Sequence, residues 1–172
     1  MIKLIQKLDL KVLEKVANIK SSFLDQIMVF ITKLGNNGFI WIAISVPFLI
    51  NKKHRLYGIK IILALILTAF IGEFIIKRIV GRIRPSGNIH PDDLLIKNPK
   101  SYSFPSGHTS SSIASASILL FSYGLIILPI FILAILIAFS RIYLKVHYLS
   151  DVLAGAFLGL TCGTFIHFII ST

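Results

Sequence analysis

Three long runs of apolar residues dominate the hydropathy pattern of the chain. They cover residues 57–76, 113–139 and 152–170, and few strongly polar residues interrupt them. A helix needs about 20 apolar residues to cross the hydrocarbon core of a bilayer, and these runs supply that length. The pattern therefore predicts an all-α, polytopic membrane helical bundle.

Shorter apolar segments and turn residues set the expected helix boundaries. Residues 21–34 and 39–50 are each short for a full span, and the sequence Gly-Asn-Asn-Gly at 35–38 predicts a helical hairpin. Four further helices are expected, over residues 57–80, 105–123, 125–142 and 147–170. The chain is thus expected to be one domain, residues 1–172, in which residues 21–172 form about six transmembrane helices.

The first 20 residues have a different periodicity. Lysine recurs at every fourth position from Lys3 to Lys15, and apolar residues occupy the opposite side of a helical wheel. Asp9 is the one residue that does not fit this division. Residues 1–20 are therefore expected to form an amphipathic helix in the head-group layer. A solvated arm is the alternative.

Composition and charge narrow the possible partners. The chain has 172 residues, 55% of them hydrophobic, and a net charge of +11. On a soluble protein this charge would suggest nucleic acid, but the apolar spans exclude that class and favour anionic lipid head groups. The single cysteine, Cys162, excludes an intrachain disulfide and any cysteine-based metal cluster.

Polar residues of catalytic type gather in three clusters that the helix order places at one membrane face. Each cluster lies at the end or start of an expected helix. The clusters are Lys77-x6-Arg84-Pro85, Pro105-Ser106-Gly107-His108 and Ser140-Arg141-x5-His147-x3-Asp151.

The first chemical feature of these clusters is an expected anion site. Lys77, Arg84 and Arg141 are three cations beside a membrane, where unpaired charge is costly, and a phosphate group would pair them. Ser106 and Gly107 open a helix, where free N–H groups and the helix dipole favour an anion. We therefore expect all five residues to bind phosphate.

The second feature is a pair of histidines. His147 and Asp151 are four residues apart and are expected to share a helix face, so that the carboxylate orients the ring and leaves one nitrogen as a nucleophile. His108 is placed to protonate the leaving oxygen. Glu73 is expected to hold Lys77 as an ion pair, with a role in proton handling as the alternative. No carboxylate cluster suggests a metal site, and no cofactor is expected.

These motifs, in this order and spacing, resemble the type 2 phosphatidic acid phosphatase family in its membrane lipid phosphatase branch. The resemblance covers residues 77–151 at the level of motifs. It implies metal-independent hydrolysis in which His147 attacks phosphorus to give a phosphohistidine and His108 acts as general acid. It also implies that Asp151 supports His147, and that the remaining motif residues bind the phosphate of a membrane lipid.

The substrate and the side of the membrane follow less directly from the sequence. The basic loop Lys52-Lys53-His54-Arg55 and the amphipathic helix are expected on the cytoplasmic side, so the site should face the periplasm or cell exterior from the cell membrane. Undecaprenyl diphosphate is then the expected substrate. Lipid A 1-phosphate, phosphatidylglycerol phosphate and phosphatidic acid stay open, as does a non-catalytic protein that binds or transports a phosphorylated lipid. The oligomeric state is not predicted.

Overall fold

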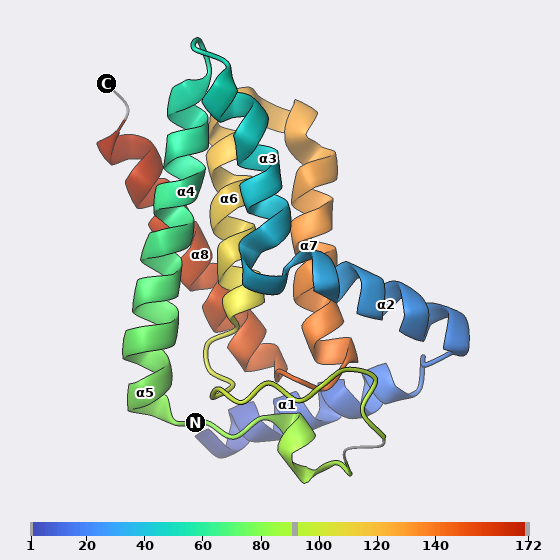
Figure 1. Cartoon of the computed structure of the whole chain (residues 1–172). Coiled ribbons are helices and arrows are strands. Elements are labelled where there is room, and N and C mark those ends of the chain that lie inside the picture. Colours follow the sequence, from blue (N-terminus) through green and yellow to red (C-terminus); the bar gives the residue numbers. More distant parts are fainter. Residues whose placement is uncertain (1, 91–92, 171–172) are drawn as a thin grey trace.

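A bundle of long helices makes up most of this computed structural model, which describes residues 2–90 and 93–170. No strand occurs among those residues, in agreement with the expected all-α class. The helices that run along the bundle are α3 (Phe39–Ile50), α4 (Arg55–Ala69), α6 (Gly107–Tyr123), α7 (Leu128–Tyr143) and α8 (Leu149–Ile169). Figure 1 shows α1 (Ile2–Ala17) across the lower end of this bundle, with α2 (Ser22–Leu34) crossing obliquely above it.

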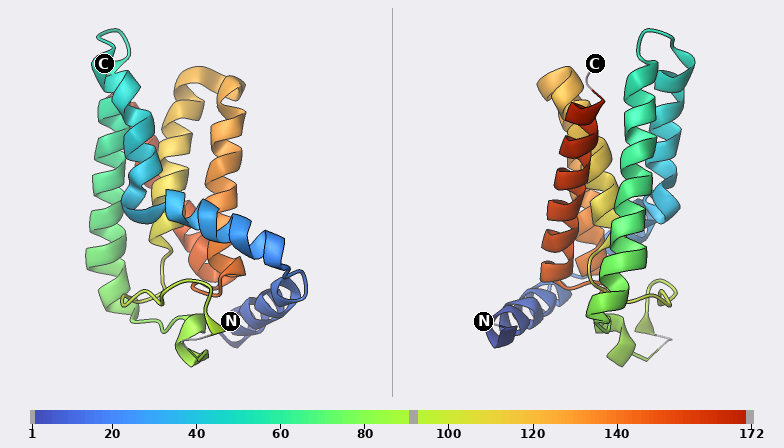
Figure 2. Two further views of the ribbon diagram at one scale, coloured as in Figure 1. Left: turned by 45° about the vertical axis from the view of Figure 1, so that its right-hand side comes forward. Right: turned by 90° about the vertical axis from the view of Figure 1, so that its left-hand side faces the viewer.

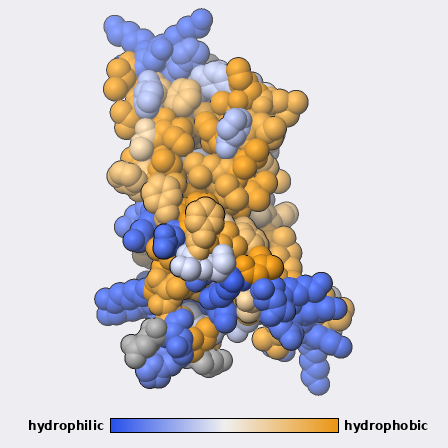
Figure 3. Space-filling view, turned by 90° about the vertical axis from the view of Figure 1, so that its right-hand side faces the viewer, coloured by the Kyte–Doolittle hydropathy of each residue, from blue (hydrophilic) through white to orange (hydrophobic). Residues whose placement is uncertain are grey.

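Three helical stretches of the described chain are long and apolar enough to cross a membrane. They are Arg55–Val80, Gly107–Tyr143 and Leu149–Ile169. The middle stretch is a hairpin, because the 3-10 turn Gly124–Ile127 joins α6 to an antiparallel α7 (Figure 2). An apolar surface lies between two polar ends (Figure 3), as expected for a protein that spans the bilayer.

The expected hairpin of residues 21–34 and 39–50 is wrong. α2 and α3 are bent by 50° rather than folded back, and they reach a candidate span only as a pair. Asn37 and Gly38 adopt left-handed backbone conformations with φ of 50° and 71°, so this short link redirects the chain without reversing it. The count of about six transmembrane helices is therefore not confirmed.

The third expected helix is continuous but irregular. It consists of α4, a π-helical turn over Phe70–Ile76, and the short α5 (Lys77–Val80). A π-turn inserts an extra residue and rotates everything that follows, and such turns often occur at functional sites. Here the π-turn contains Glu73 and directly precedes Lys77.

Close packing of α6 against α8 joins the two segments that carry the histidines. A Cβ on Gly155 would lie 2.6 Å from the carbonyl oxygen of Ser106, and similar clashes would occur at Gly159 and Gly163. The amide of Ser106 also donates to the carbonyl of Asp151 at 3.0 Å. Small residues thus let the two backbones approach and fix the start of α6 beside the start of α8.

The amphipathic helix lies at the opposite end of the bundle from the basic loop 52–55. α1 packs against α7 and α8 beneath the cavity end, whereas the loop joins α3 to α4 at the far end (Figures 1 and 2). The expectation that both lie on one side of the membrane is therefore wrong. It assumed that two spans separate them, but α2 and α3 form a single bent unit.

Candidate active site

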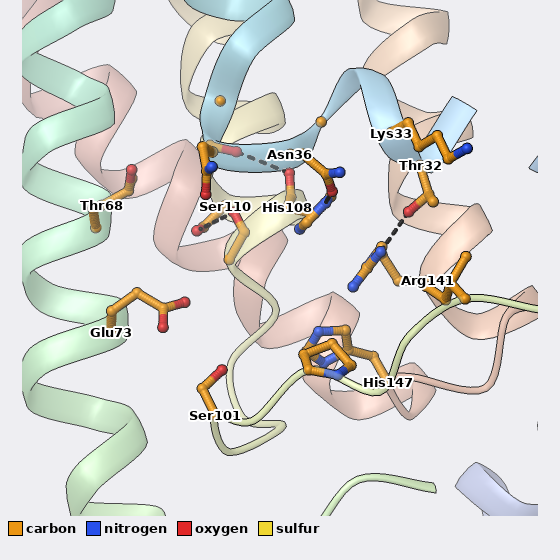
Figure 4. Close-up of a pocket in the computed structure, with 18 of the residues that line it drawn as sticks. Thr32, Lys33, Asn36, Thr68, Glu73, Ser101, His108, Ser110, Arg141 and His147 are labelled. Carbon is orange, nitrogen blue, oxygen red and sulfur yellow. Dashed lines mark hydrogen bonds between the residues drawn. The ribbon is translucent and has the colours of Figure 1, made fainter. Parts of the chain in front are cut away.

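A cavity of about 900 Å³ opens at the end of the bundle near α1. Figure 4 shows side chains from α2, α4, α6 and α7 and from the loop before α8 converging on it. Six of the eight predicted site residues line this cavity: Lys77, Arg84, Gly107, His108, Arg141 and His147. The other two, Ser106 and Asp151, are fully buried behind it.

His147 lies before α8 and not on it. Lys145 has a φ of 57°, and this left-handed residue turns the chain so that the amide of His147 donates to the carbonyl of Arg141 at 3.1 Å. α8 begins only at Leu149, because the carboxylate of Asp151 accepts a hydrogen bond from the amide of Tyr148 at 2.8 Å and caps the helix. The expected shared helix face of His147 and Asp151 is therefore wrong.

The imidazole of His147 has its Nε2 directed at a cation. Nη1 of Arg84 lies 2.9 Å from Nε2 of His147, and because arginine only donates, Nε2 holds a lone pair and Nδ1 the proton. Nδ1 lies 3.6 Å from Oδ2 of Asp151, which is too long for a hydrogen bond but close enough for the carboxylate to stabilise a positive charge that develops on the ring.

The ionisation state of His147 suits a nucleophile. Burial, followed by the charges of Arg84, Arg141 and Lys77, lowers the pKa of His147 well below its ordinary value. The free ring is therefore neutral at physiological pH, which keeps the lone pair on Nε2 available.

Arg84 is held rigidly by the protein. Its guanidinium donates to the carbonyls of Ser101, Tyr102 and Val146 and to the hydroxyl of Ser101, at 2.8 to 3.1 Å. Together with the contact to His147, these bonds engage Nε and both terminal nitrogens. A phosphate oxygen that enters the cavity would draw the Nη1 donor away from Nε2 and release the lone pair for attack.

The other two cations face the cavity from opposite sides. Nζ of Lys77 lies 2.5 Å from Oε1 of Glu73 and 3.2 Å from the hydroxyl of Ser101. Arg141 donates to the hydroxyl of Thr32 through Nη1, while its buried Nε has no hydrogen-bond partner among the described residues. An oxyanion in the cavity would satisfy that donor.

The start of α6 presents backbone and imidazole groups to the same space. The hydroxyl of Ser106 caps the helix by accepting from the amide and hydroxyl of Thr109. A Cβ on Gly107 would lie 2.7 Å from Oε1 of Glu73, so a larger residue there would displace the Glu73 side chain. Nε2 of His108 lies 3.0 Å from Oδ1 of Asn36.

Four residues that contact the site were not identified from the sequence. Thr32, in the last turn of α2, contacts Arg141, and Asn36, in the turn that follows, contacts His108. Ser101 and Arg82 lie between α5 and α6 and contact Lys77 and Asp151 respectively. Their residue types are common in turns and loops. The incorrect hairpin prediction also placed Thr32 and Asn36 away from the site. Only Arg82 carried a signal, as a charge two residues before the motif arginine.

Comparison with known proteins agrees with this geometry. The PAP2 superfamily matches residues 57–172, which contain all three motifs. This chain belongs to the PAP2 superfamily. Among PAP2 proteins it is 34% identical, over 137 residues, to an undecaprenyl-diphosphatase of Sulfolobus acidocaldarius, covering 79% of this chain and 66% of that protein. It is 33% identical, over 147 residues, to the undecaprenyl-diphosphatase BcrC of Bacillus subtilis, covering 83% and 73%.

The PAP2 fold extends through the described chain. A transmembrane PAP2-type phosphatidylglycerolphosphate phosphatase from Bacillus subtilis superposes with a TM-score of 0.75 at 25% identity, covering 98% of this chain and 85% of that one. These relatives support lipid phosphatase activity in a membrane protein. Their names differ in substrate, so PAP2 membership leaves the lipid itself to be determined.

Proposed function

We propose that this PAP2 protein removes phosphate from a membrane lipid through a phosphohistidine on His147. The observation that carries the proposal is the position of Nε2 of His147, which lies 2.9 Å from Nη1 of Arg84 in one cavity with three cations. Binding or transport of a phosphorylated lipid would require the cations but no neutral, oriented imidazole, which makes catalysis the better supported function.

In the proposed reaction, Nε2 of His147 forms a bond to phosphorus as the bond to the lipid oxygen breaks. Lys77, Arg84 and Arg141 neutralise the phosphoryl oxygens, together with the amides at the start of α6. His108 donates a proton to the departing oxygen, and Asp151 stabilises the positive charge that develops on the ring of His147. Water then attacks phosphorus and gives a proton to His108, and the bond between phosphorus and Nε2 of His147 breaks to release inorganic phosphate.

We propose undecaprenyl diphosphate as the substrate. The two relatives with that name support it, as does a cavity wide enough for a diphosphate. Lipid A 1-phosphate, phosphatidylglycerol phosphate and phosphatidic acid are the alternatives. Release of phosphate from a panel of these lipids by the purified enzyme in detergent is the experiment that decides among them, and turnover of the alternatives alone would reject the diphosphate.

The same assay tests metal independence, which follows from the three cations taking the electrostatic role of a metal. We expect turnover in strong chelator to equal turnover without it. Vanadate should inhibit, because it adopts the five-coordinate geometry of the transition state. Loss of activity in chelator that magnesium restores would contradict this reading of the site.

The side of the membrane depends on the substrate proposal. With the four lysines of α1 at the cavity end, the distribution of cations no longer places that end outside. We nevertheless propose that the site faces the periplasm or cell exterior from the cell membrane. A carrier lipid that releases the group it carries outside the cell remains in the outer leaflet as the diphosphate, so its phosphatase would act on that side.

Single cysteines in a Cys162→Ala background would test this orientation. Asn98 and Asn51 are both exposed, at the cavity end and at the far end respectively, and neither replacement changes the charge. In intact cells a membrane-impermeant thiol reagent should label Asn98→Cys and spare Asn51→Cys. The reverse pattern would place the chemistry in the cytoplasm and reject an outward-facing substrate.

A further inference from the structure

Asp9 is a buried carboxylate on α1, next to residues of the same helix that are exposed. It is 1% exposed, whereas Leu4 and Leu8 on the same helix are 62% and 51% exposed. Its Oδ1 accepts from the amide of Ser150 at 2.9 Å, and its Oδ2 accepts from the hydroxyl of Ser150 at 2.6 Å. The residue that does not fit the amphipathic pattern of α1 is therefore bound to the first turn of α8.

Arg82 links Asp9 to the catalytic carboxylate. Its Nη2 lies 2.7 Å from Oδ2 of Asp9, and its Nη1 lies 2.7 Å from Oδ1 of Asp151. The guanidinium also stacks over the ring of Tyr148, with its central carbon 4.0 Å from the centroid. Burial alone would lower the pKa of Arg82, but the two carboxylates raise it above its ordinary value.

These contacts form a continuous path from the interfacial helix to the nucleophile. Asp151 receives Arg82 on Oδ1 and the amide of Tyr148 on Oδ2, and that second oxygen is the one 3.6 Å from Nδ1 of His147. Both carboxylates thus bind the first turn of α8, where free amides and the helix dipole favour negative charge.

From this path we infer that Asp9 is a positioning residue for the reaction, which acts on His147 through Arg82 and Asp151. The inference rests on the proposed function of His147. Asp9 takes up one terminal nitrogen of Arg82, so that the guanidinium engages only one oxygen of Asp151 and leaves the other directed at the imidazole. Without Asp9, Arg82 can pair with both oxygens and draw the carboxylate away from the ring.

The path also gives α1 a role beyond attachment to the bilayer. The helix exposes apolar residues and lysines that suit the head-group layer, while Asp9 and Val16 are buried against the protein. The position of α1 at the membrane surface and the placement of His147 are therefore linked through the side chain of Asp9.

A double-mutant cycle on the rate constant of phosphohistidine formation tests this inference. The rate constant and the amplitude are both measured in single-turnover experiments on the full-length enzyme. The rate constant gives the speed of the step in the active molecules, whereas the amplitude gives the fraction of enzyme that is folded and active. Asp9→Asn should lower the rate constant about tenfold and leave the KM for the lipid unchanged, and Asp9→Glu should restore part of the loss. In an Asp151→Asn background, Asp9→Asn should change it less than about twofold.

Glu14→Gln is the matched control, since Glu14 is exposed on the same helix and loses the same charge. It should keep the wild-type rate constant. Equal losses from Asp9→Asn with and without Asp151, or a loss of amplitude alone, would overturn the inference and leave Asp9 as a structural residue.

Should Asp9→Asn fail to fold, Ser150→Ala removes only the hydroxyl that bridges Asp9 and Arg82. It should then show the same dependence on Asp151, and additive losses would overturn the inference. Absence of phosphohistidine in the wild type would instead reject the proposed function.

Discussion

His147→Ala is expected to lower kcat by about 10⁴-fold or more, because it removes the atom that we propose bonds to phosphorus. The ring is 2% exposed and lines the cavity together with Lys77, Arg84 and Arg141. The loss should appear in kcat while the lipid still binds, since the cations that hold the phosphate are unchanged. Phosphate release in detergent, with binding measured in parallel, gives both quantities.

Two variants complete this test. Asp151→Asn should leave a slow enzyme, because the amide keeps the helix cap but no longer stabilises positive charge on the ring. His167→Ala removes a histidine far from the cavity and should keep near-normal turnover. Near-normal activity in His147→Ala would contradict the assignment of the nucleophile.

His108→Ala is expected to slow hydrolysis of a lipid phosphate by about 10²–10⁴-fold, the usual contribution of a general acid. His108 lies at the start of α6 and lines the cavity with His147 (Figure 4). A lipid alkoxide or phosphate leaving group needs the proton that His108 supplies. The rate of lipid hydrolysis by the variant measures this loss.

A substrate with a good leaving group provides the control for His108. Nitrophenyl phosphate departs without a proton, so its hydrolysis by His108→Ala should fall much less than that of the lipid. His147→Ala should lose activity on both substrates. Equal losses on both substrates in His108→Ala would assign the residue to phosphate binding instead of proton transfer.

The all-helical class and the convergence of the three motifs could be inferred from the sequence because each depends on local pattern. Long apolar runs predict α4, α6, α7 and α8. The number of spans between two motifs, odd or even, then decides whether those motifs lie at the same end of the bundle. The four-residue spacing of the glycines at positions 155, 159 and 163 is itself typical of close helix packing. None of these inferences requires the conformation of a loop.

The errors arose where one or two backbone angles decide the outcome. Asn37 and Gly38 could form a reversal or a bend, and composition does not distinguish them. Tyr148, the extended N-cap residue of α8, separates His147 from that helix although the spacing to Asp151 suits a helix. Asp9 did not fit the amphipathic pattern of α1, and the local sequence could not explain it because its partners, Arg82 and Ser150, lie 73 and 141 residues away in the chain.

Chemical identification of the phosphoenzyme tests the central claim most directly. Wild-type enzyme is mixed with lipid labelled in the departing phosphate, quenched in alkaline detergent within one turnover, and digested to locate the label. The account predicts an acid-labile, base-stable phosphohistidine on the peptide that contains His147, and none in His147→Ala. An acid-stable phosphoserine would contradict the mechanism, and bound lipid that is never hydrolysed would show a binding protein instead of an enzyme.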